Sequence, residues 1–300
     1  MNYSIVVPFR NAEAFIGLLL PRLLEQHNCI EIIAIDSEST DATAQLLSSY
    51  PIKYIHILAS EFNHGATRDM AMRLAASEIV VFLTQDALPD ASDSLATLVN
   101  SFEDESVGIA YGRQLPHKDA KPFGAHARLF NYPKESRLKT YTDKSELGIK
   151  TPFCSNSFAA YRKSAYLEVG GFPTDTILSE DMLAAAKMLK AGYKVAYNAD
   201  SCVYHSHDYG ITEEFRRYFD TGVFHARNSW IREEFGGAGG EGARYVSSEL
   251  RYLAKGAPYL IPQLFIRNAA KLFGFRLGLI EDTLALWLKK KLSMHKGYWT

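Results

Sequence analysis

Short apolar segments alternate with longer amphipathic segments in the first third of the chain. The apolar segments are rich in β-branched residues, as is typical of strands, and cover residues 3–7, 30–35, 52–58, 79–83 and 107–111. Between them, apolar residues at helical spacing predict helices over residues 11–26 (broken at Pro21), 41–49, 67–76 and 92–102. Strands joined by helices imply crossover connections, so we expect an α/β fold with a mainly parallel sheet flanked by helices.

Two acidic turns follow strands of this expected sheet. Asp36 ends the strand at 30–35, and Asp86 follows the unbroken apolar run at 79–83, which is typical of a strand buried on both faces. Ligands of open α/β sheets bind beyond the carboxyl ends of the strands. We therefore expect both carboxylates at one binding edge, together with the polar turn Asn63-His64-Gly65 at the start of a helix.

The middle of the chain loses this regular alternation. Residues 116–152 show no steady period and predict a partly helical insertion, either a flap that faces the substrate or a plain surface excursion. A later helix begins at Ser179-Glu180-Asp181, where the serine is expected to cap it and the acids to favour its dipole. Strands at 194–197 and 201–204 follow, and the second runs into His205-Ser206-His207.

The last third, residues 211–300, is helical, aromatic and basic, with a flexible glycine-rich break at 236–242. Beside the lysines at 289–291 lies an apolar stripe formed by Leu277, Ile280, Leu284, Trp287 and Leu288. This pattern predicts a helix lying on an anionic membrane surface, and ordinary core packing of the stripe is the alternative.

Composition narrows the class of protein. With 300 residues, 47% of them hydrophobic, and a net charge of −1, the chain is a globular protein and not a whole-chain nucleic-acid binder. Cys29, Cys154 and Cys202 form no CxxC pair, which favours reduced thiols over a disulfide framework or a zinc site. We expect no signal peptide after Met1 and no apolar run that reaches the roughly 20 residues needed to span a bilayer.

Several motifs, in this order and spacing, resemble glycosyltransferase family 2 over residues 1–210: IVVPFRN, IDSESTDAT, NHGATRDMAMRLA, VVFLTQDALP, GGF and SED. More narrowly, FNHGATRD, FLTQDALP, HSHDYG with FRRYFDTGVFHAR, and KKKLSMHKGYW are similar to bacterial rhamnosyltransferases that use dTDP-L-rhamnose. The resemblance implies a GT-A fold and inverting transfer of L-rhamnose to a hydroxyl of a bacterial surface glycan. It also implies a polyprenyl-diphosphate-linked acceptor and peripheral contact with the cytoplasmic face of the cell membrane.

The resemblance places Asp86 at the last position of the family's Asp-x-Asp, as a ligand of Mg²⁺ or Mn²⁺. Thr84 stands at the first position, so one carboxylate is missing. His205 or His207 is the expected supplement, because side-chain alternation puts both imidazoles on one face of an extended strand. Two alternatives remain open: one of the histidines only packs, or Asp86 only caps its turn.

For the nucleotide, Asp36 corresponds to the family carboxylate that accepts the imide N–H of a pyrimidine base. Arg68 resembles an arginine that contacts the base or the pyrophosphate, and a surface ion pair is the alternative. The other expected nucleotide contacts are Pro8, Phe9, Arg10, Ser37 and Gln85.

For the chemistry, Asp181 matches the family's base, which removes the proton of the acceptor hydroxyl. Its neighbour Glu180 either orients the acceptor or supports the helix dipole. The expected acceptor or sugar contacts are Arg113, Asn156 and Ser157.

The sequence also bears on alternative functions. The QxxRW motif of processive synthases is absent, which favours single addition. The same fold acting on a UDP-hexose, and a non-catalytic nucleotide- or glycan-binding module, both remain open. A nucleotidyltransferase would need a glycine-rich phosphate loop after the first strand, and VVPFRNAEAF lacks one.

Overall fold

The computed structural model describes residues 1–237 and 240–299. The first third alternates strands and helices as expected: β1 (Tyr3–Phe9), α1 (Glu13–Leu24), β2 (Cys29–Ser37), α2 (Thr43–Ser48), β3 (Lys53–Ile57), α3 (His64–Leu74) and β4 (Ile79–Leu83). The middle contains β5 (Leu88–Pro89), α4 (Ser94–Val99), β6 (Val107–Leu115), α5 (Pro122–Asn131), β7 (Arg137–Lys139), α6 (Lys144–Leu147), β8 (Phe158–Arg162), α7 (Lys163–Glu168), α8 (Glu180–Lys190) and β9 (Lys194–Tyr204). The rest is helical: α9 (Ile211–Arg227), α10 (Ser229–Phe235), α11 (Glu241–Gly256), α12 (Ile261–Leu279) and α13 (Leu286–Leu292).

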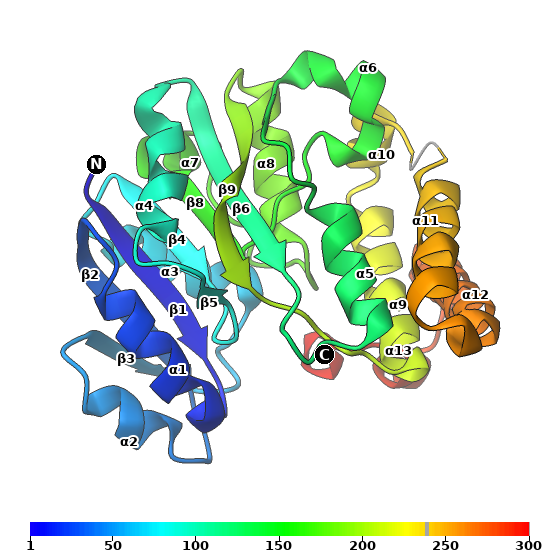
Figure 1. Cartoon of the computed structure of the whole chain (residues 1–300), viewed down its shortest axis with the longest axis horizontal. Coiled ribbons are helices and arrows are strands. Elements are labelled where there is room, and N and C mark those ends of the chain that lie inside the picture. The colour runs from blue at the N-terminus through cyan, green and yellow to red at the C-terminus, as the bar shows by residue number, and fades with distance from the viewer. Residues whose placement is uncertain (238–239, 300) are drawn as a thin grey trace.

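Within the described residues, nine strands form one sheet in the order β3-β2-β1-β4-β8-β6-β9-β5, with β7 pairing β9 (Figure 1). The neighbours β3-β2-β1-β4 and the pair β6-β9 are parallel, and β8 runs antiparallel between β4 and β6. Crossover helices α1, α2 and α3 join the parallel strands, because a parallel neighbour cannot be reached by a tight turn. Their carboxyl ends therefore share one edge, and this confirms the expected α/β class.

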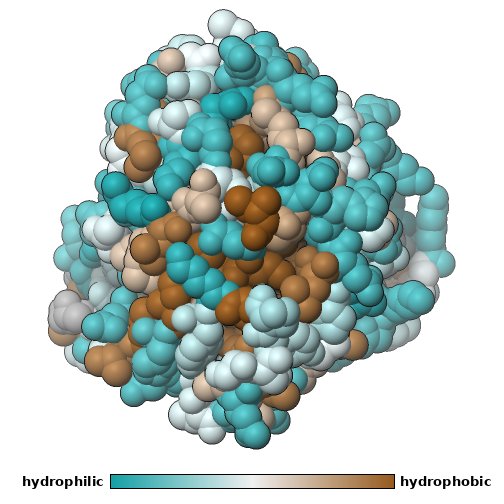
Figure 2. All heavy atoms as spheres, turned by 90° about the vertical axis from the view of Figure 1, so that its left-hand side faces the viewer, coloured by the Kyte–Doolittle hydropathy of each residue, from teal (hydrophilic) through white to brown (hydrophobic). Residues whose placement is uncertain are grey.

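Helices cover both faces of the sheet. Val6, Val80 and Phe82 pack with α3, α7 and α8, whereas Ile5, Val7 and Val81 pack with α1 and α4. Strands β1 and β4 are thus buried on both sides, as their unbroken apolar runs indicate. The left-hand face of Figure 1, where β3 is the open edge of the sheet, bears a hydrophobic patch (Figure 2).

The predicted break at Pro21 is wrong. Helix α1 continues through Pro21 to Leu24. The carbonyl deprived of its hydrogen bond belongs to Gly17, which is exposed, so water can satisfy it. Meanwhile Leu19, Leu20 and Leu23 are fully buried and hold the helix against the sheet.

Residues 116–152 supply elements of the main body. Strand β7 joins the sheet beside β9, and α5 packs against α11 through His126, whose Nε2 lies 3.0 Å from Ser248 Oγ. The two strands expected at 194–197 and 201–204 form the single strand β9. Its register against β6 shifts between Gly112 and Arg113, which accommodates the extra residues as a bulge.

The C-terminal helices lie beside one end of the sheet, opposite the N-terminal strands (Figure 1). Between them, α9 and α12 cross with their backbones in close approach. A Cβ on Gly278 would lie 2.1 Å from the Phe219 carbonyl oxygen, and one on Gly222 would lie 2.2 Å from that of Phe275. Only glycine permits this approach, so the crossing is fixed by the sequence.

Two expectations for this region change. The five-residue apolar stripe is split: Leu277 and Leu284 pack against the core, whereas Ile280 and Trp287 are exposed, because a 3₁₀ turn at Glu281–Thr283 separates α12 from α13. Of the predicted glycine-rich break at 236–242, residues 238 and 239 lie outside the described chain.

The expectation of free cysteines is confirmed, and no helix among the described residues is long and apolar enough to cross a membrane.

The α9–α12 crossing predicts opposite effects for two Gly→Ala substitutions. Gly278→Ala forces the helices apart and should destabilise the protein by about 1–3 kcal/mol. Gly17→Ala is the matched control: this helical glycine has nothing within 4 Å of its added Cβ, so the change should stabilise by about 0.5–1 kcal/mol. Thermal unfolding of both variants checks the sign; a Gly278→Ala protein as stable as the Gly17→Ala protein would contradict the close crossing.

Candidate active site

The Asp36 carboxylate lies at the end of β2 and has a hydroxyl donor on each of its two oxygens. It is 1% exposed and pairs in register with Phe9 of the parallel strand β1. Its Oδ1 accepts from Ser39 Oγ at 2.5 Å, and its Oδ2 lies 3.3 Å from Tyr54 OH. Burial raises the pKa of Tyr54, and the charge of Asp36 adds to this effect. The tyrosine therefore stays a neutral donor beside the carboxylate.

The loops after β1 and β4 are locked to each other. The Arg10 amide donates to Gln85 Oε1 at 2.8 Å, and Gln85 Nε2 donates back to the Arg10 carbonyl at 3.2 Å. The predicted residues Pro8, Phe9 and Ser37 lie beside this link; Phe9 and Ser37 are buried, so the side chain of Phe9 belongs to the core and supports the strand end. The turn that carries Asp86 is thereby held next to the expected base pocket.

Asp86 faces two histidines. Its Oδ2 lies 3.5 Å from His205 Nε2 and 3.8 Å from His207 Nδ1, and the three donor groups lie within 4.8 Å of one another. Burial lowers the pKa of His205, and burial likewise lowers that of His207 to about 3. Both imidazoles are neutral at physiological pH, which is the form that binds metals. This favours joint ligation over the alternative in which one histidine only packs.

Gln114 fixes the tautomer of His205. Arg128 Nη1 donates to Gln114 Oε1 at 2.5 Å, and since a guanidinium is donor only, the amide oxygen must be on that side. The same oxygen lies 2.8 Å from His205 Nδ1, so Nδ1 carries the proton and Nε2 keeps a lone pair. Nε2 is buried without a hydrogen-bond partner in the described chain and faces the Asp86 carboxylate. Two opposed acceptors fit a cation between them, and the residues present therefore suit a metal.

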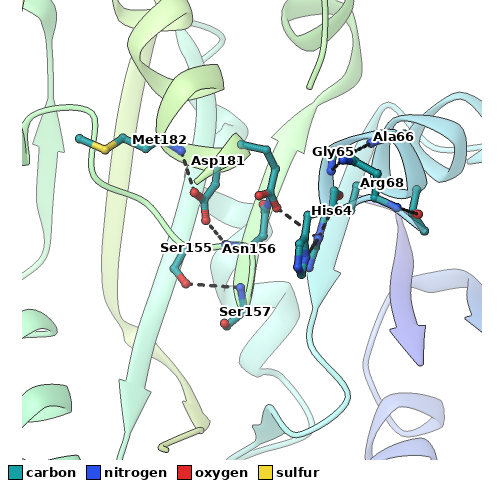
Figure 3. A network of polar contacts seen from close by, with 12 residues as sticks. His64, Gly65, Ala66, Arg68, Ser155, Asn156, Ser157, Asp181 and Met182 are labelled. Atoms are coloured by element: carbon teal, nitrogen blue, oxygen red, sulfur yellow. Dashed lines mark hydrogen bonds and ion pairs between the residues drawn. The ribbon is translucent and has the colours of Figure 1, made fainter. Parts of the chain in front are cut away.

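Asp181 is the second residue of α8 and is held by two backbone amides (Figure 3). Asn156 N–H donates to Oδ2 at 2.9 Å, and Met182 N–H donates to Oδ1 at 2.8 Å. Burial raises the pKa of Asp181 to about 6, and the adjacent charge of Glu180 adds to this. The carboxylate is ionised at neutral pH and yet more basic than an ordinary aspartate.

Ser179 does not cap this helix, contrary to prediction. It has a left-handed backbone conformation with φ of 62° and makes no side-chain cap hydrogen bond. The amide of Met182 is instead bonded to Asp181. A strained residue directly before the two acids fixes their direction at some local cost.

Glu180 is paired with Arg68, and both are buried. Arg68 Nη1 lies 3.2 Å from Glu180 Oε1, which also accepts from Asn156 Nδ2 at 2.9 Å. Burial alone would raise the pKa of Glu180, but the charge of Arg68, the neighbouring His64 and the hydrogen bond from Asn156 together outweigh burial and lower the pKa. Neighbouring carboxylates with pKa values pushed apart have divided roles. Glu180 is the permanent anion, and the surface ion pair considered for Arg68 is replaced by a buried one.

The turn that carries Arg68 is built for close contact. Asn63 caps α3 by accepting from the amides of Gly65 and Ala66 at 2.9 and 3.0 Å. A Cβ on Gly65 would lie 1.8 Å from the Pro173 carbonyl oxygen, so this position requires glycine. His64, whose pKa burial lowers to about 4, packs edge-on against His295 of the C-terminal segment. The site thus includes a residue from the end of the chain.

The remaining predicted residues are spread around these clusters. Asn156 lies at the centre, because Tyr161 OH also donates to its Oδ1 at 2.7 Å. Ser157 follows it, and its amide lies 3.4 Å from Ser155 Oγ. Arg113 Nε donates to the Tyr132 carbonyl at 3.3 Å and supports the end of α5.

Sequence reasoning missed Gln114 and Arg128 as parts of the site. Gln114 had a usable signal, since it lies near the end of a strand beside Arg113. His64 was expected at the binding edge only as a member of its turn, without a role of its own. Arg128 belongs to the aperiodic insertion, and no local pattern marks it.

Comparison with known proteins gives the family. The pattern of the family described as "Glycosyl transferase family 2" matches residues 4–170. The O-antigen chain rhamnosyltransferase WbaN of Salmonella anatum is 51% identical over 270 residues, which are 90% of this chain and 86% of the relative. The O-antigen chain rhamnosyltransferase RfbN of Salmonella typhimurium is 47% identical over 306 residues, covering 100% of this chain and 96% of the relative. The chain belongs to glycosyltransferase family 2, as its motifs indicate.

Two solved structures share the fold. The mannosyltransferase PcManGT from Pyrobaculum calidifontis, in complex with GDP-Man and Mn²⁺, superposes with a TM-score of 0.63 at 20% identity, covering 94% of this chain and 88% of that one. Staphylococcus aureus TarS 1–349 in complex with UDP superposes with a TM-score of 0.55 at 17% identity, covering 94% and 91%. These similarities confirm the expected glycosyltransferase fold.

Removing one partner of the Arg68–Glu180 pair should lower the stability of the protein strongly, and removing the second charge as well should restore part of it. Arg68→Met leaves Glu180 as an uncompensated buried charge and should cost about 3–5 kcal/mol. The double variant Arg68→Met with Glu180→Gln removes that charge and should recover a large part of the loss. Chemical denaturation of the two variants and of Glu180→Gln alone measures the coupling; simple additivity would contradict a direct pair.

Proposed function

We propose that the protein is an inverting rhamnosyltransferase of O-antigen biosynthesis. It moves L-rhamnose from dTDP-L-rhamnose to a hydroxyl of a growing surface glycan carried on a polyprenyl diphosphate at the cytoplasmic face of the cell membrane. The observation that carries the proposal is 47% identity to one O-antigen chain rhamnosyltransferase along the whole chain. The site clusters at Asp36, Asp86 and Asp181 supply the chemistry that such a transfer requires.

The donor nucleotide binds at the ends of β1, β2 and β4. Asp36 accepts the imide N–H of the base, a role suited to a buried carboxylate that already accepts hydrogen bonds from the hydroxyls of Ser39 and Tyr54. Gln85 and Arg10 shape the neighbouring loop, and Arg68 stands at the start of α3 with its Nε buried and without a partner in the described chain. Thymine and uracil present the same imide group, so the choice between them is made elsewhere in the site.

Asp86, His205 and His207 would hold a divalent cation, Mg²⁺ or Mn²⁺. Such an ion neutralises the charge that develops on the leaving diphosphate. Two imidazoles with one carboxylate suit Mn²⁺ better than Mg²⁺, because Mg²⁺ prefers oxygen ligands alone. His207 thus replaces, as a ligand, the carboxylate that is missing at position 84, where this chain has a threonine.

Asp181 is the base. Its carboxylate accepts the proton of the acceptor hydroxyl while that oxygen forms a bond to the anomeric carbon. The bond from that carbon to the diphosphate breaks on the opposite face, and dTDP leaves with the electron pair, so the configuration inverts. Glu180, held by Arg68 and Asn156, keeps the start of α8 in place and raises the basicity of Asp181.

The donor assignment is tested by turnover of the purified chain with dTDP-L-rhamnose and with UDP-glucose. We expect transfer only from the rhamnose donor. Asp181→Asn should reduce transfer by three orders of magnitude or more while dTDP binding, measured by calorimetry, is unchanged. Turnover with UDP-glucose alone would contradict the donor, and dTDP binding without turnover would favour a binding module.

The pH profile of transfer tests the raised pKa of Asp181. Since the base must be ionised, the rate should rise through pH about 6 to a plateau, and at pH 5 it should be roughly tenfold below that plateau. A profile that stays flat to pH 4.5 would remove Asp181 as the titrating base.

Metal binding is tested on the chain without donor by titrating Mn²⁺ and following its electron paramagnetic resonance signal. Gln114→Leu leaves all three proposed ligands in place but frees the His205 tautomer, and should weaken Mn²⁺ roughly 10–100-fold. Gln114→Glu retains an acceptor for Nδ1–H and should restore most of the affinity. His27→Ala, an exposed histidine on the loop before β2, is the matched control; equal affinities in all variants would contradict the site.

A further inference from the structure

The outer face of α12 is an apolar stripe. Its large members Phe265, Ile266, Leu272 and Phe273 are each between 55% and 65% exposed. At 100° per residue they share roughly 120° of the helix surface with Ala269, Arg276 and Ile280, all of which are exposed. Contiguous exposed apolar patches of this kind mark interaction sites.

Contacts on the opposite side of α12 keep the apolar stripe facing outward. On the opposite side of α12, Arg267 and Lys271 lie 3.0 and 3.4 Å from Glu214 of α9. Gly274 and Gly278 press against α9 so closely that a Cβ on either would lie within 2.3 Å of a carbonyl oxygen. The helix therefore cannot rotate to bury its apolar side against the rest of the protein.

Basic side chains accompany the stripe. Arg276 lies within it, and Lys290 and Lys291 are exposed on α13, which follows α12 after the 3₁₀ turn; on the same helix, Lys289 is bonded to Glu281 at 2.5 Å. Within the described part of the chain, neither Arg276 nor either of these two lysines forms an ion pair. Trp287, 67% exposed, stands beside them. Tryptophan and lysine next to an apolar helix face are typical of the boundary between lipid tails and headgroups.

We propose that the outer face of α12, extended by Trp287, Lys290 and Lys291 of α13, docks the protein on an anionic lipid bilayer. The stripe inserts between headgroups, and the basic residues are attracted to the charge of the leaflet. A second copy of the chain fits this surface less well. A symmetric dimer through α12 would bring Arg276 of both copies to the same interface, and like charges oppose that arrangement.

This inference deepens the proposed function, since a lipid-linked acceptor lies in the same bilayer, but the two can fail separately. Rhamnosyl transfer to a short water-soluble glycan tests the function without any membrane. Variants of the α12 face leave all proposed site residues untouched, so their transfer to the soluble glycan should equal that of the wild type. Failure of the wild type in that assay would count against the function and leave the docking surface unaffected.

The docking surface is tested by sedimentation of the full chain with vesicles of phosphatidylcholine, or of an equal mixture of phosphatidylcholine and phosphatidylglycerol. The wild type should bind the anionic vesicles, and Phe265→Ser with Phe273→Ser should weaken this binding at least tenfold. Lys290→Gln with Lys291→Gln should also weaken it about tenfold and reduce its sensitivity to salt. Leu18→Ser with Leu24→Ser, at exposed positions on α1, is the matched control and should bind as the wild type does.

Three results would overturn the proposal. The wild type fails to bind anionic vesicles, or the α12 variant binds them as well as the control variant does. Alternatively, analytical ultracentrifugation shows a dimer that the α12 variant dissociates, which would make this face an interface between copies of the chain.

Discussion

The buried ion pair between Arg68 and Glu180 joins parts of the chain that no regular secondary structure connects. Arg68 comes from α3, Glu180 from the start of α8, and Asn156, which bonds to Glu180, from the loop before β8. A charge buried in this way is costly unless its partner is in place, so the pair fixes the relative positions of α3, the start of α8 and the loop before β8. The proposed donor side and acceptor side of the site would keep their relative positions because both are tied to this pair.

The same pair also makes the pKa values of two adjacent acids differ. Glu180 is satisfied by Arg68 and remains an anion, and its permanent charge helps to raise the pKa of Asp181 to about 6. Within the described residues, Asp181 accepts hydrogen bonds only from backbone amides, whereas the charge of Glu180 helps to raise its pKa. Two carboxylates at consecutive positions thus differ: Glu180 has a lowered pKa and a buried partner, whereas Asp181 has a raised pKa.

The sequence predicted those features that depend on local patterns. Unbroken apolar runs located β1, β2 and β4, and parallel connections implied that Asp36 and Asp86 share an edge. Features that depend on contacts between distant segments could not be predicted from local patterns. The capping role assigned to Ser179 failed because its backbone conformation is imposed by tertiary structure, and the link from Arg128 through Gln114 to His205 joins three separate elements. The predicted apolar stripe from Leu277 to Leu288 is split between buried and exposed positions, because hydrophobic spacing alone does not say which side of a helix is already covered.

One contact of α12 bears on the distance between the proposed docking surface and the proposed metal ligands. Arg267 Nη1, on the side of the helix opposite the apolar stripe, donates to the carbonyl of Tyr209 at 2.9 Å, two residues beyond His207. With α12 docked on a bilayer as proposed, this bond would set the height of the proposed metal ligands above the lipid. A sugar at the end of a lipid-linked glycan would then reach the site only when the glycan has a suitable number of units.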